Sequence, residues 1–310
     1  NKKFYPKNFD LPPVPKYPEH KRVRVGYFSA DFREHPVSDL VVGLFEEHDR
    51  SQFEIYAFYF GPKTNDKMNL RIKKGVDKYY EVGKMSDVEV AKLARTHELD
   101  IAIDLGGYTA SSRTKIFAML VAPVQASYLG FTGTMGSKYI DYIIADQFVI
   151  PKGSQKYYTE NIAYLPNSYM INESNIKPSK KSPRRKDYGL PIDGFVFCCF
   201  NNHFKITPSV FGCWMSVLAQ VDGSVLWLSE AHKSTSNNLK KKAKIHGIDP
   251  NRLVFASRVP LKEDHLSRLQ LADLFVDTHP FNAHVTASDA LRIGLPVLTC
   301  IGTSFASRVA

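Results

Sequence analysis

The sequence lacks the long apolar run and the leader pattern that would send a chain into or across a membrane. None of its hydrophobic stretches approaches the roughly 20 residues that span a bilayer. The chain does not open with the charged, apolar and small-residue succession of a signal peptide. These absences predict a protein with no membrane partner and a cytoplasmic location.

Cysteine is also scarce, with 4 in 310 residues. Cys198, Cys199, Cys213 and Cys300 lie in apolar surroundings, without the paired spacing of a zinc site or of a secreted disulfide framework. We therefore expect reduced, buried thiols and no metal ligands.

Several catalytic motifs are missing as well. The sequence has no glycine-rich loop ending in Gly-Lys-Ser/Thr, no G-x-G-x-x-G opening a helix, no G-x-S-x-G elbow and no metal-ligand pair at helical spacing. These absences count against a P-loop kinase, a nicotinamide dehydrogenase, a serine hydrolase and a zinc enzyme. A nucleotide-sugar enzyme remains compatible with the sequence.

The composition that is present indicates a globular, basic protein. With 44% hydrophobic and 23% charged residues, the chain is long enough for two domains. Its net charge of +10 is concentrated in two segments, 177–186 and 240–244. Neither has interleaved aromatics or a nucleic-acid module, which favours a solvated linker and a solvated helix face over a nucleic-acid partner. An anionic small ligand would also suit this charge.

Strand-like and helix-like segments alternate along most of the chain. Residues 1–20 hold five prolines and predict an extended lead-in. The alternation then runs through 21–166, stops in a basic linker at 167–186 and restarts at 187–310. Alternation of this kind predicts an α/β fold with parallel, helix-covered sheets. We expect two Rossmann-like domains facing across a cleft at the carboxyl ends of the strands.

Polar side chains gather where these strands end. Helix starts at such places expose N–H groups and partial positive charge that suit an anion. Each residue has an ordinary interpretation too, such as a helix cap or a solvated lysine, but their recurrence at consecutive strand ends favours a site for a diphosphate and a sugar. The candidates in the second half are Asn202, Phe204, Lys205, Lys262, His265, Asn282, His284, Thr286, Ser288 and Asp289, and in the first half Ser29, Asp31 and His35.

With these residues in view, the chain resembles the catalytic region of the O-linked N-acetylglucosamine transferases, particularly the compact bacterial type. The matching stretches include "RVGYFSADFREHPVSDL", "DLGGYT", "APVQASYLGFTGTMG", "FNNHFKITP", "VPLKEDHLSRLQLADLFVDTHPFNAH", "TASDAL" and "FASRVA", in family order over almost all of 21–310. The resemblance implies a GT-B fold and an inverting, metal-independent transfer of GlcNAc from UDP-GlcNAc to Ser or Thr hydroxyls of an acceptor protein or peptide.

The resemblance also implies roles for particular residues. Lys205 matches the lysine that steadies the departing diphosphate, with Asn202 and Phe204 beside it. Lys262 and His265 match the pair at the ribose and uracil. The segment around the diphosphate is matched by His284 and Thr286, the ribose-binding acid by Asp289, and one candidate for the catalytic base by His35. Water is the other candidate for proton removal.

The match also has departures. Tyr108 stands where the family often has His, Thr132 where it has Pro, and Val285 where it has Thr. Relatives continue beyond "FASRVA", so we expect the second domain to be incomplete within this chain, and many carry tetratricopeptide repeats upstream. Two alternative functions stay open: a SPINDLY-like protein O-fucosyltransferase using GDP-fucose, and a non-catalytic nucleotide-sugar-binding relative.

Overall fold

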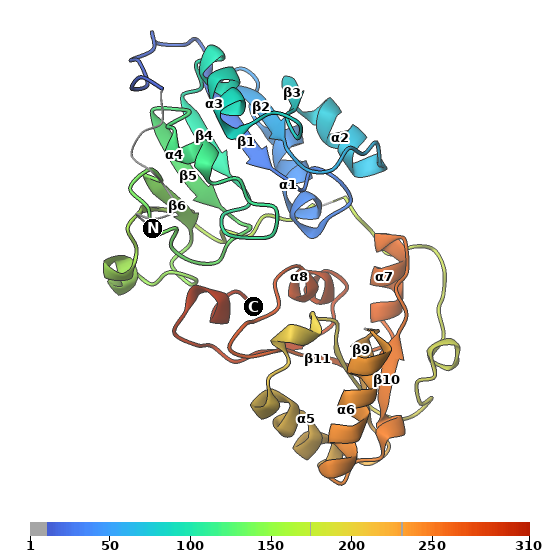
Figure 1. Ribbon diagram of the computed structural model, residues 1–310. Coiled ribbons are helices and arrows are strands. Elements are labelled where there is room, and N and C mark those ends of the chain that lie inside the picture. Colours follow the sequence, from blue (N-terminus) through green and yellow to red (C-terminus); the bar gives the residue numbers. More distant parts are fainter. Residues whose placement is uncertain (1–10, 174, 231) are drawn as a thin grey trace. The chain divides into compact units, whose positions relative to one another are not determined.

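The computed structural model describes residues 11–173, 175–230 and 232–310. The chain forms two compact units, divided between residues 174 and 175 (Figure 1). This division falls inside the segment 167–186 that the sequence analysis assigned to a linker. Of the expected lead-in, residues 11–20 form neither helix nor strand, and residues 1–10 lie outside the described part.

Unit 1 contains a sheet of seven parallel strands with helices packed on it (Figure 1). Five of the seven residues of β1 are buried, as expected when helices cover both faces of a parallel sheet. The strands, in spatial order, are β3 (Lys78–Glu81), β2 (Phe53–Tyr59), β1 (Val23–Ser29), β4 (Ile101–Asp104), β5 (Val124–Tyr128), β6 (Tyr142–Ala145) and β7 (Asn161–Tyr164). The helices are α1 (Pro36–Glu47), α2 (Lys67–Gly75), α3 (Asp87–Thr96) and α4 (Lys115–Ala118), with a 3-10 helix at Lys152–Tyr157.

Unit 2 contains a second, five-stranded parallel sheet. Its strands, in spatial order, are β10 (Leu253–Ala256), β9 (Val225–Ser229), β8 (Val196–Cys199), β11 (Leu274–Val276) and β12 (Val297–Leu298). The helices are α5 (Pro208–Gln220), α6 (Lys233–Ile245), α7 (Lys262–Leu269) and α8 (Val285–Arg292), with 3-10 helices at Arg185–Tyr188, His203–Lys205, Pro250–Arg252 and Phe305–Ser307. The two parallel sheets with their helices confirm the predicted α/β fold class.

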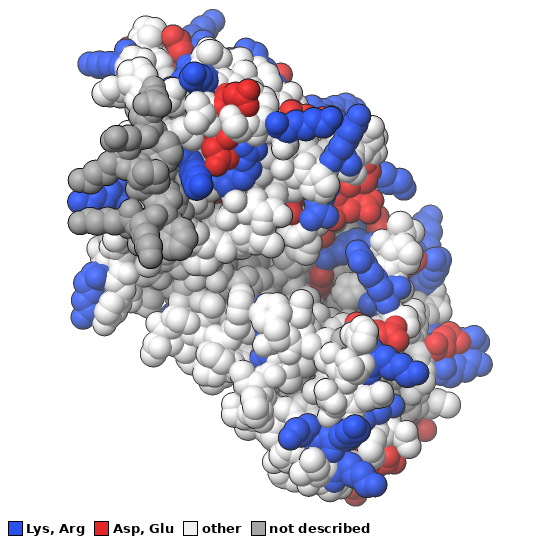
Figure 2. All heavy atoms as spheres, in the orientation of Figure 1, with Lys and Arg blue, Asp and Glu red and all other residues white. Residues whose placement is uncertain are grey.

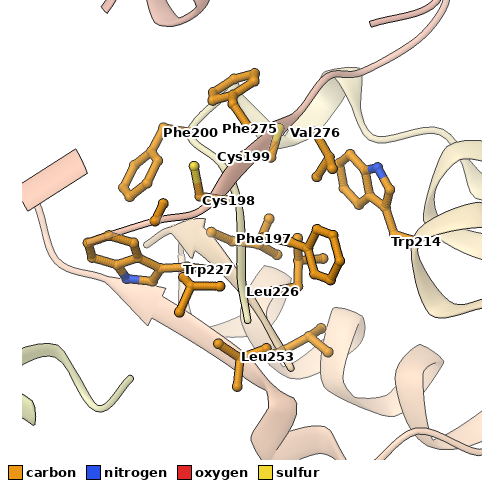
Figure 3. Close-up of a cluster of buried hydrophobic side chains, with 14 of the residues drawn as sticks. Phe197, Cys198, Cys199, Phe200, Trp214, Leu226, Trp227, Leu253, Phe275 and Val276 are labelled. Atoms are coloured by element: carbon orange, nitrogen blue, oxygen red, sulfur yellow. The ribbon is translucent and has the colours of Figure 1, made fainter. Parts of the chain in front are cut away.

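The core of unit 2 is built on β8, the middle strand, whose four residues are all buried. Aromatic and aliphatic side chains from the neighbouring strands and from α5 surround it, among them Trp214, Trp227 and Phe275 (Figure 3). This rigid centre fixes the place where β8 and its neighbours end, which is where the candidate residues lie.

Residues 175–186, which begin unit 2, are held against the rest of that unit by ion pairs. Lys181 Nζ lies 2.7 Å from Asp264 Oδ2, and Arg185 donates to Asp273 Oδ2 at 2.7 Å. The basic segment at 240–244 lies in α6, where only Ala243 is buried. Figure 2 shows Lys and Arg side chains over this part of unit 2. The exposed lysines agree with the predicted solvated helix face.

The cysteine prediction was half right. All four thiols are free, and Cys198 and Cys199 are buried, but Cys213 and Cys300 are exposed. Cys213 lies two residues after the buried Phe211 of α5, and such a position points to the other side of a helix. None of the described helices is long and apolar enough to cross a membrane.

Candidate functional site

Three neighbouring strands of unit 2 end around one carboxylate. β11 lies between β8 and β12, and Asp277 directly follows it. Asn201, just beyond β8, donates to Asp277 Oδ1 at 3.0 Å, and Thr299, just beyond β12, donates to Oδ2 at 2.6 Å. The backbone N–H groups of Thr278 and Ala283 also donate to Oδ1, each at 2.7 Å. Asp277 therefore ties together the exits of three strands.

The start of α8 is attached to the same network. Thr286 Oγ1 donates to Asn201 Oδ1, and Asn201 Nδ2 donates to Thr278 Oγ1 at 2.8 Å. His284 occupies the N-cap position, but its side chain makes no capping bond. A helix start of this kind carries unpaired N–H groups and partial positive charge, so it attracts anions.

Lys205 brings a positive charge to this helix start. It follows β8 in a short 3-10 helix, and its Nζ donates to Asn282 O at 2.8 Å. An ammonium has three N–H donors, and this is the one hydrogen bond recorded from it in the described residues. Burial lowers the pKa of Lys205 to about 8, while the negative charge of Asp277 acts in the opposite direction. The side chain is thus a pre-oriented cation at neutral pH.

His284 contributes a buried nitrogen that lacks a partner. Its ring lies 5.2 Å from the Phe281 ring, centre to centre, and no described residue hydrogen-bonds its Nε2. Burial, and then the charge of Lys205, lower the pKa of His284 to about 3, so the imidazole is neutral. A buried polar atom without a partner is costly. Beside a lysine and a helix start, it indicates a ligand position.

A second cluster lies one turn further along α8. Lys262 Nζ donates to Asp289 Oδ2 at 2.5 Å, and His265 Nε2 lies 4.0 Å from the same oxygen. Arg268 Nε donates to His265 Nδ1 at 3.2 Å. Burial first, and then Arg268 and Lys262, lower the pKa of His265 to about 3. Burial raises the pKa of Asp289, and Lys262 opposes that rise. Asp289 and Thr286 are three residues apart, on one face of the helix.

Of the remaining predicted residues of unit 2, Asn202 and Phe204 are exposed at its surface, Ser288 is half-buried and Asn282 is buried. Asn202 caps the short helix after β8 by accepting a bond from the Phe204 N–H at 3.3 Å. The side chain of Phe204 is 69% exposed, with its ring 6.0 Å from that of Phe281. An exposed aromatic face is available to a flat ligand group.

The structure therefore groups the sequence-predicted residues of unit 2 in two clusters joined by α8. It also adds residues that the sequence reasoning missed as members of the site: Asn201, Asp277, Phe281, Arg268 and Thr299. A signal for Asn201 and Asp277 was present, since each is the first strongly polar residue after a buried strand. Arg268 gave no such signal, because its role depends on the fold around His265.

His35 belongs to unit 1, at the N-cap of α1. Its Nδ1 accepts a hydrogen bond from the Val37 N–H at 3.2 Å, and its Nε2 lies 3.7 Å from Asp31 Oδ1. Burial lowers the pKa of His35, with Asp31 acting in the opposite direction and Arg33 adding to the effect. A neutral ring that accepts at Nδ1 carries its proton on Nε2. In this arrangement His35 is a hydrogen-bond donor on its Nε2 side.

Unit 2 also has an apolar cavity of about 470 Å³ between α5 and strands β11 and β12. Trp214, Val217 and Leu298 are among its lining residues. This lining suits neither a diphosphate nor a sugar, so the polar clusters are the better candidate site. In the described ranges, no group of three His, Cys, Asp or Glu side chains could hold a metal ion.

Two parallel α/β units, with a lysine and a helix start grouped at a strand exit of the second, are the architecture of the GT-B glycosyltransferases. The structure of Anabaena Alr3699/HepE in complex with UDP shares this fold, with a TM-score of 0.55 at 13% identity over 89% of this chain and 79% of that one. At such low identity the likeness shows the fold alone.

The particular family is shown by closer matches. The chain belongs to glycosyl transferase family 41, whose model matches residues 7–179 and 175–310. It is 36% identical to the probable UDP-N-acetylglucosamine–peptide N-acetylglucosaminyltransferase SEC of Arabidopsis thaliana, over 96% of this chain and 31% of that protein. A mutant O-GlcNAc transferase of Thermobaculum terrenum matches at 30% identity and a TM-score of 0.86, over 96% of this chain and 56% of that one. The chain thus spans about a third of the SEC protein.

Proposed function

We propose that this chain is the catalytic part of an inverting glycosyltransferase that moves GlcNAc from UDP-GlcNAc to Ser or Thr hydroxyls of proteins. The observation that carries the proposal is the grouping of the Lys205 ammonium with the unpartnered His284 Nε2 at the start of α8. Membership of family 41 and the printed names of the relatives support the choice of donor and acceptor.

The chemistry requires that the leaving UDP be stabilised as its negative charge develops. Preorganised donors aimed at developing charge are often the largest contribution to catalysis. Lys205 and the N–H groups that begin α8 are such donors, so we propose that they bind the diphosphate without a metal cofactor. His284 and Thr286 line the same place.

The second cluster suits the nucleoside part of the donor. A buried carboxylate held by a lysine can accept hydrogen bonds from ribose hydroxyls, which we assign to Asp289 and Lys262. We place the base near His265, with Phe204 and Asn202 at the edge of the donor site. These assignments rest on the grouping of the side chains and on the resemblance of their motifs.

His35 is proposed to act on the acceptor side of the reaction. Its proton lies on Nε2 in the observed arrangement, so we propose that it orients a reacting group by donating a hydrogen bond. Removal of the acceptor proton is then assigned to water. Holding the acceptor hydroxyl in line with the departing group is itself a large catalytic contribution.

The partners and location follow from the same proposal. The acceptor is a protein or peptide, and tetratricopeptide repeats in a full-length chain would present it. The four free cysteines are compatible with a reducing compartment, which supports a cytoplasmic location.

Calorimetric titration with UDP, GDP and UDP-GlcNAc, followed by transfer of labelled sugar to a Ser/Thr peptide, tests the function. We expect UDP and UDP-GlcNAc to bind more tightly than GDP, and the label to reach the peptide. A preference for GDP would replace the proposal with a fucosyltransferase. Binding of UDP-GlcNAc without any transfer would leave a non-catalytic relative.

A further inference from the structure

We propose that Asp277 is a positioning residue of the donor site, which fixes the start of α8 and supplies the counter-charge for Lys205. This inference rests on the proposed function, since it concerns the same donor. It assigns the residue no contact with the donor itself.

The hydrogen bonds of Asp277 show why it acts indirectly. A carboxylate offers about four lone-pair positions to donors. Four donors already meet this one: the Asn201 amide, the Thr299 hydroxyl and the backbone N–H groups of Thr278 and Ala283. With 9% of its surface exposed, Asp277 has little capacity left for a sugar hydroxyl. Its bonds instead fix the surrounding chain.

Those hydrogen bonds hold the chain on both sides of His284. Ala283 immediately precedes His284, and its N–H is bound by Asp277 directly. Thr286 follows His284 by two residues and is bound through Asn201, which Asp277 holds in turn. Because geometry errors of about 1 Å can cost a hundredfold in rate, loss of these hydrogen bonds should lower turnover.

Asp277 also acts electrostatically on Lys205. The titratable groups recorded against Lys205 in the described part of the chain come from three elements: Asp277 after β11, Cys199 in β8 and His284 at the start of α8. Burial raises the pKa of Cys199 to about 12 and lowers that of His284 to about 3, so both are neutral at pH 7. Asp277 is thus the anion of the three, and it opposes the loss of the lysine proton.

The test is the pH dependence of UDP-GlcNAc binding by the whole chain, measured by calorimetry without acceptor between about pH 6.5 and 9. The diphosphate diester keeps one charge state in this range, and the loss of the uracil proton near its upper end affects every variant alike, so a difference in the pH break between variants reports Lys205. In the wild type we expect affinity to fall above about pH 8. In Asp277→Asn, which has nearly the same shape, we expect this fall to begin lower, by on the order of one pH unit.

Asp222→Asn is the matched control, because it makes the same change of side chain and charge at an exposed position of unit 2. Its affinity should change little and its pH break should stay in place. If Asp277→Asn does not fold, Asp277→Glu serves instead: affinity should drop while the break remains at the wild-type pH.

An unmoved break in Asp277→Asn, or a moved break in Asp277→Glu, would overturn the inference while leaving the proposed function intact. Absence of UDP-GlcNAc binding by folded wild-type protein at every pH would overturn the proposed function itself. The two failures are therefore distinguishable in one set of titrations.

Discussion

Lys205 holds its ammonium 4.0 Å from the centre of the Phe281 ring. The ring comes from the loop between β11 and α8, and the next residue of that loop, Asn282, accepts the lysine's hydrogen bond. A cation placed on an aromatic face in this way gains roughly 0.5–2 kcal/mol. The ammonium is therefore already in position before an anion binds, which lowers the reorganisation needed during the reaction.

Lys205→Ala should lower turnover by roughly 10²- to 10³-fold, because the leaving UDP loses its preorganised cation. Steady-state kinetics with UDP-GlcNAc and an acceptor peptide would measure the loss. Lys241→Ala, on the exposed face of α6, is the matched control and should leave turnover unchanged. Equal rates for Lys205→Ala and wild type would remove this lysine from the mechanism.

Removing the lysine from the ion pair between Lys262 and Asp289 should destabilise unit 2. Lys262→Met leaves the buried Asp289 carboxyl without its cation, and we expect a loss on the order of 2 kcal/mol in the free energy of unfolding. Adding Asp289→Leu should recover part of that loss, because no buried charge then remains. Urea unfolding of both variants gives the comparison, and a double variant less stable than the single one would contradict it.

His284 should make the protein sensitive to acid. Its pKa is about 3 in the folded chain against 6.5 in the unfolded one, so the unfolded state binds the proton more readily. The stability contributed by the neutral ring is complete above pH 6.5 and is lost progressively as the pH falls toward 3.

We therefore expect His284→Gln to lose less stability than the wild type between pH 7 and pH 4.5, by roughly 2 kcal/mol. Urea midpoints at the two pH values provide the measurement. His246→Gln, at an exposed position after α6, is the control and should follow the wild type. An equal loss of stability between pH 7 and pH 4.5 in His284→Gln and wild type would show that this ring does not resist protonation.

Two substitutions separate the capping role of His35 from its proposed role in the reaction. Asn can also cap a helix, so His35→Asn should keep the thermal midpoint of the wild type and lose turnover, since it lacks the Nε2 proton. His35→Ala should lose turnover and also about 1 kcal/mol of stability. Thermal unfolding and peptide transfer assays measure the two effects. Full turnover in His35→Asn would restrict His35 to its capping role.

Much of the fold could be predicted from local patterns in the sequence. Apolar residues run without interruption through all of β8, through the first four residues of β9 and through the last five of β2. Helix α3 begins at the capping box of Ser86 and Glu89. Elements that bury few residues were missed: α2 buries only Asn69 and Ile72, and no residue of β7 is buried. The apolar pattern of residues 113–123 favours a longer helix than the one observed, since α4 extends only from Lys115 to Ala118.

The sequence by itself determined the class of the fold and the polar residues at the strand ends, because hydrophobic periodicity and motif order are local properties of the chain. Only the tertiary structure decided that β11 lies between β8 and β12, and hence that Asp277 meets both Asn201 and Thr299. It also decided the charge states of Lys205 and His284. Those depend on burial by segments distant in sequence, and desolvation cannot be read from a residue's immediate neighbours.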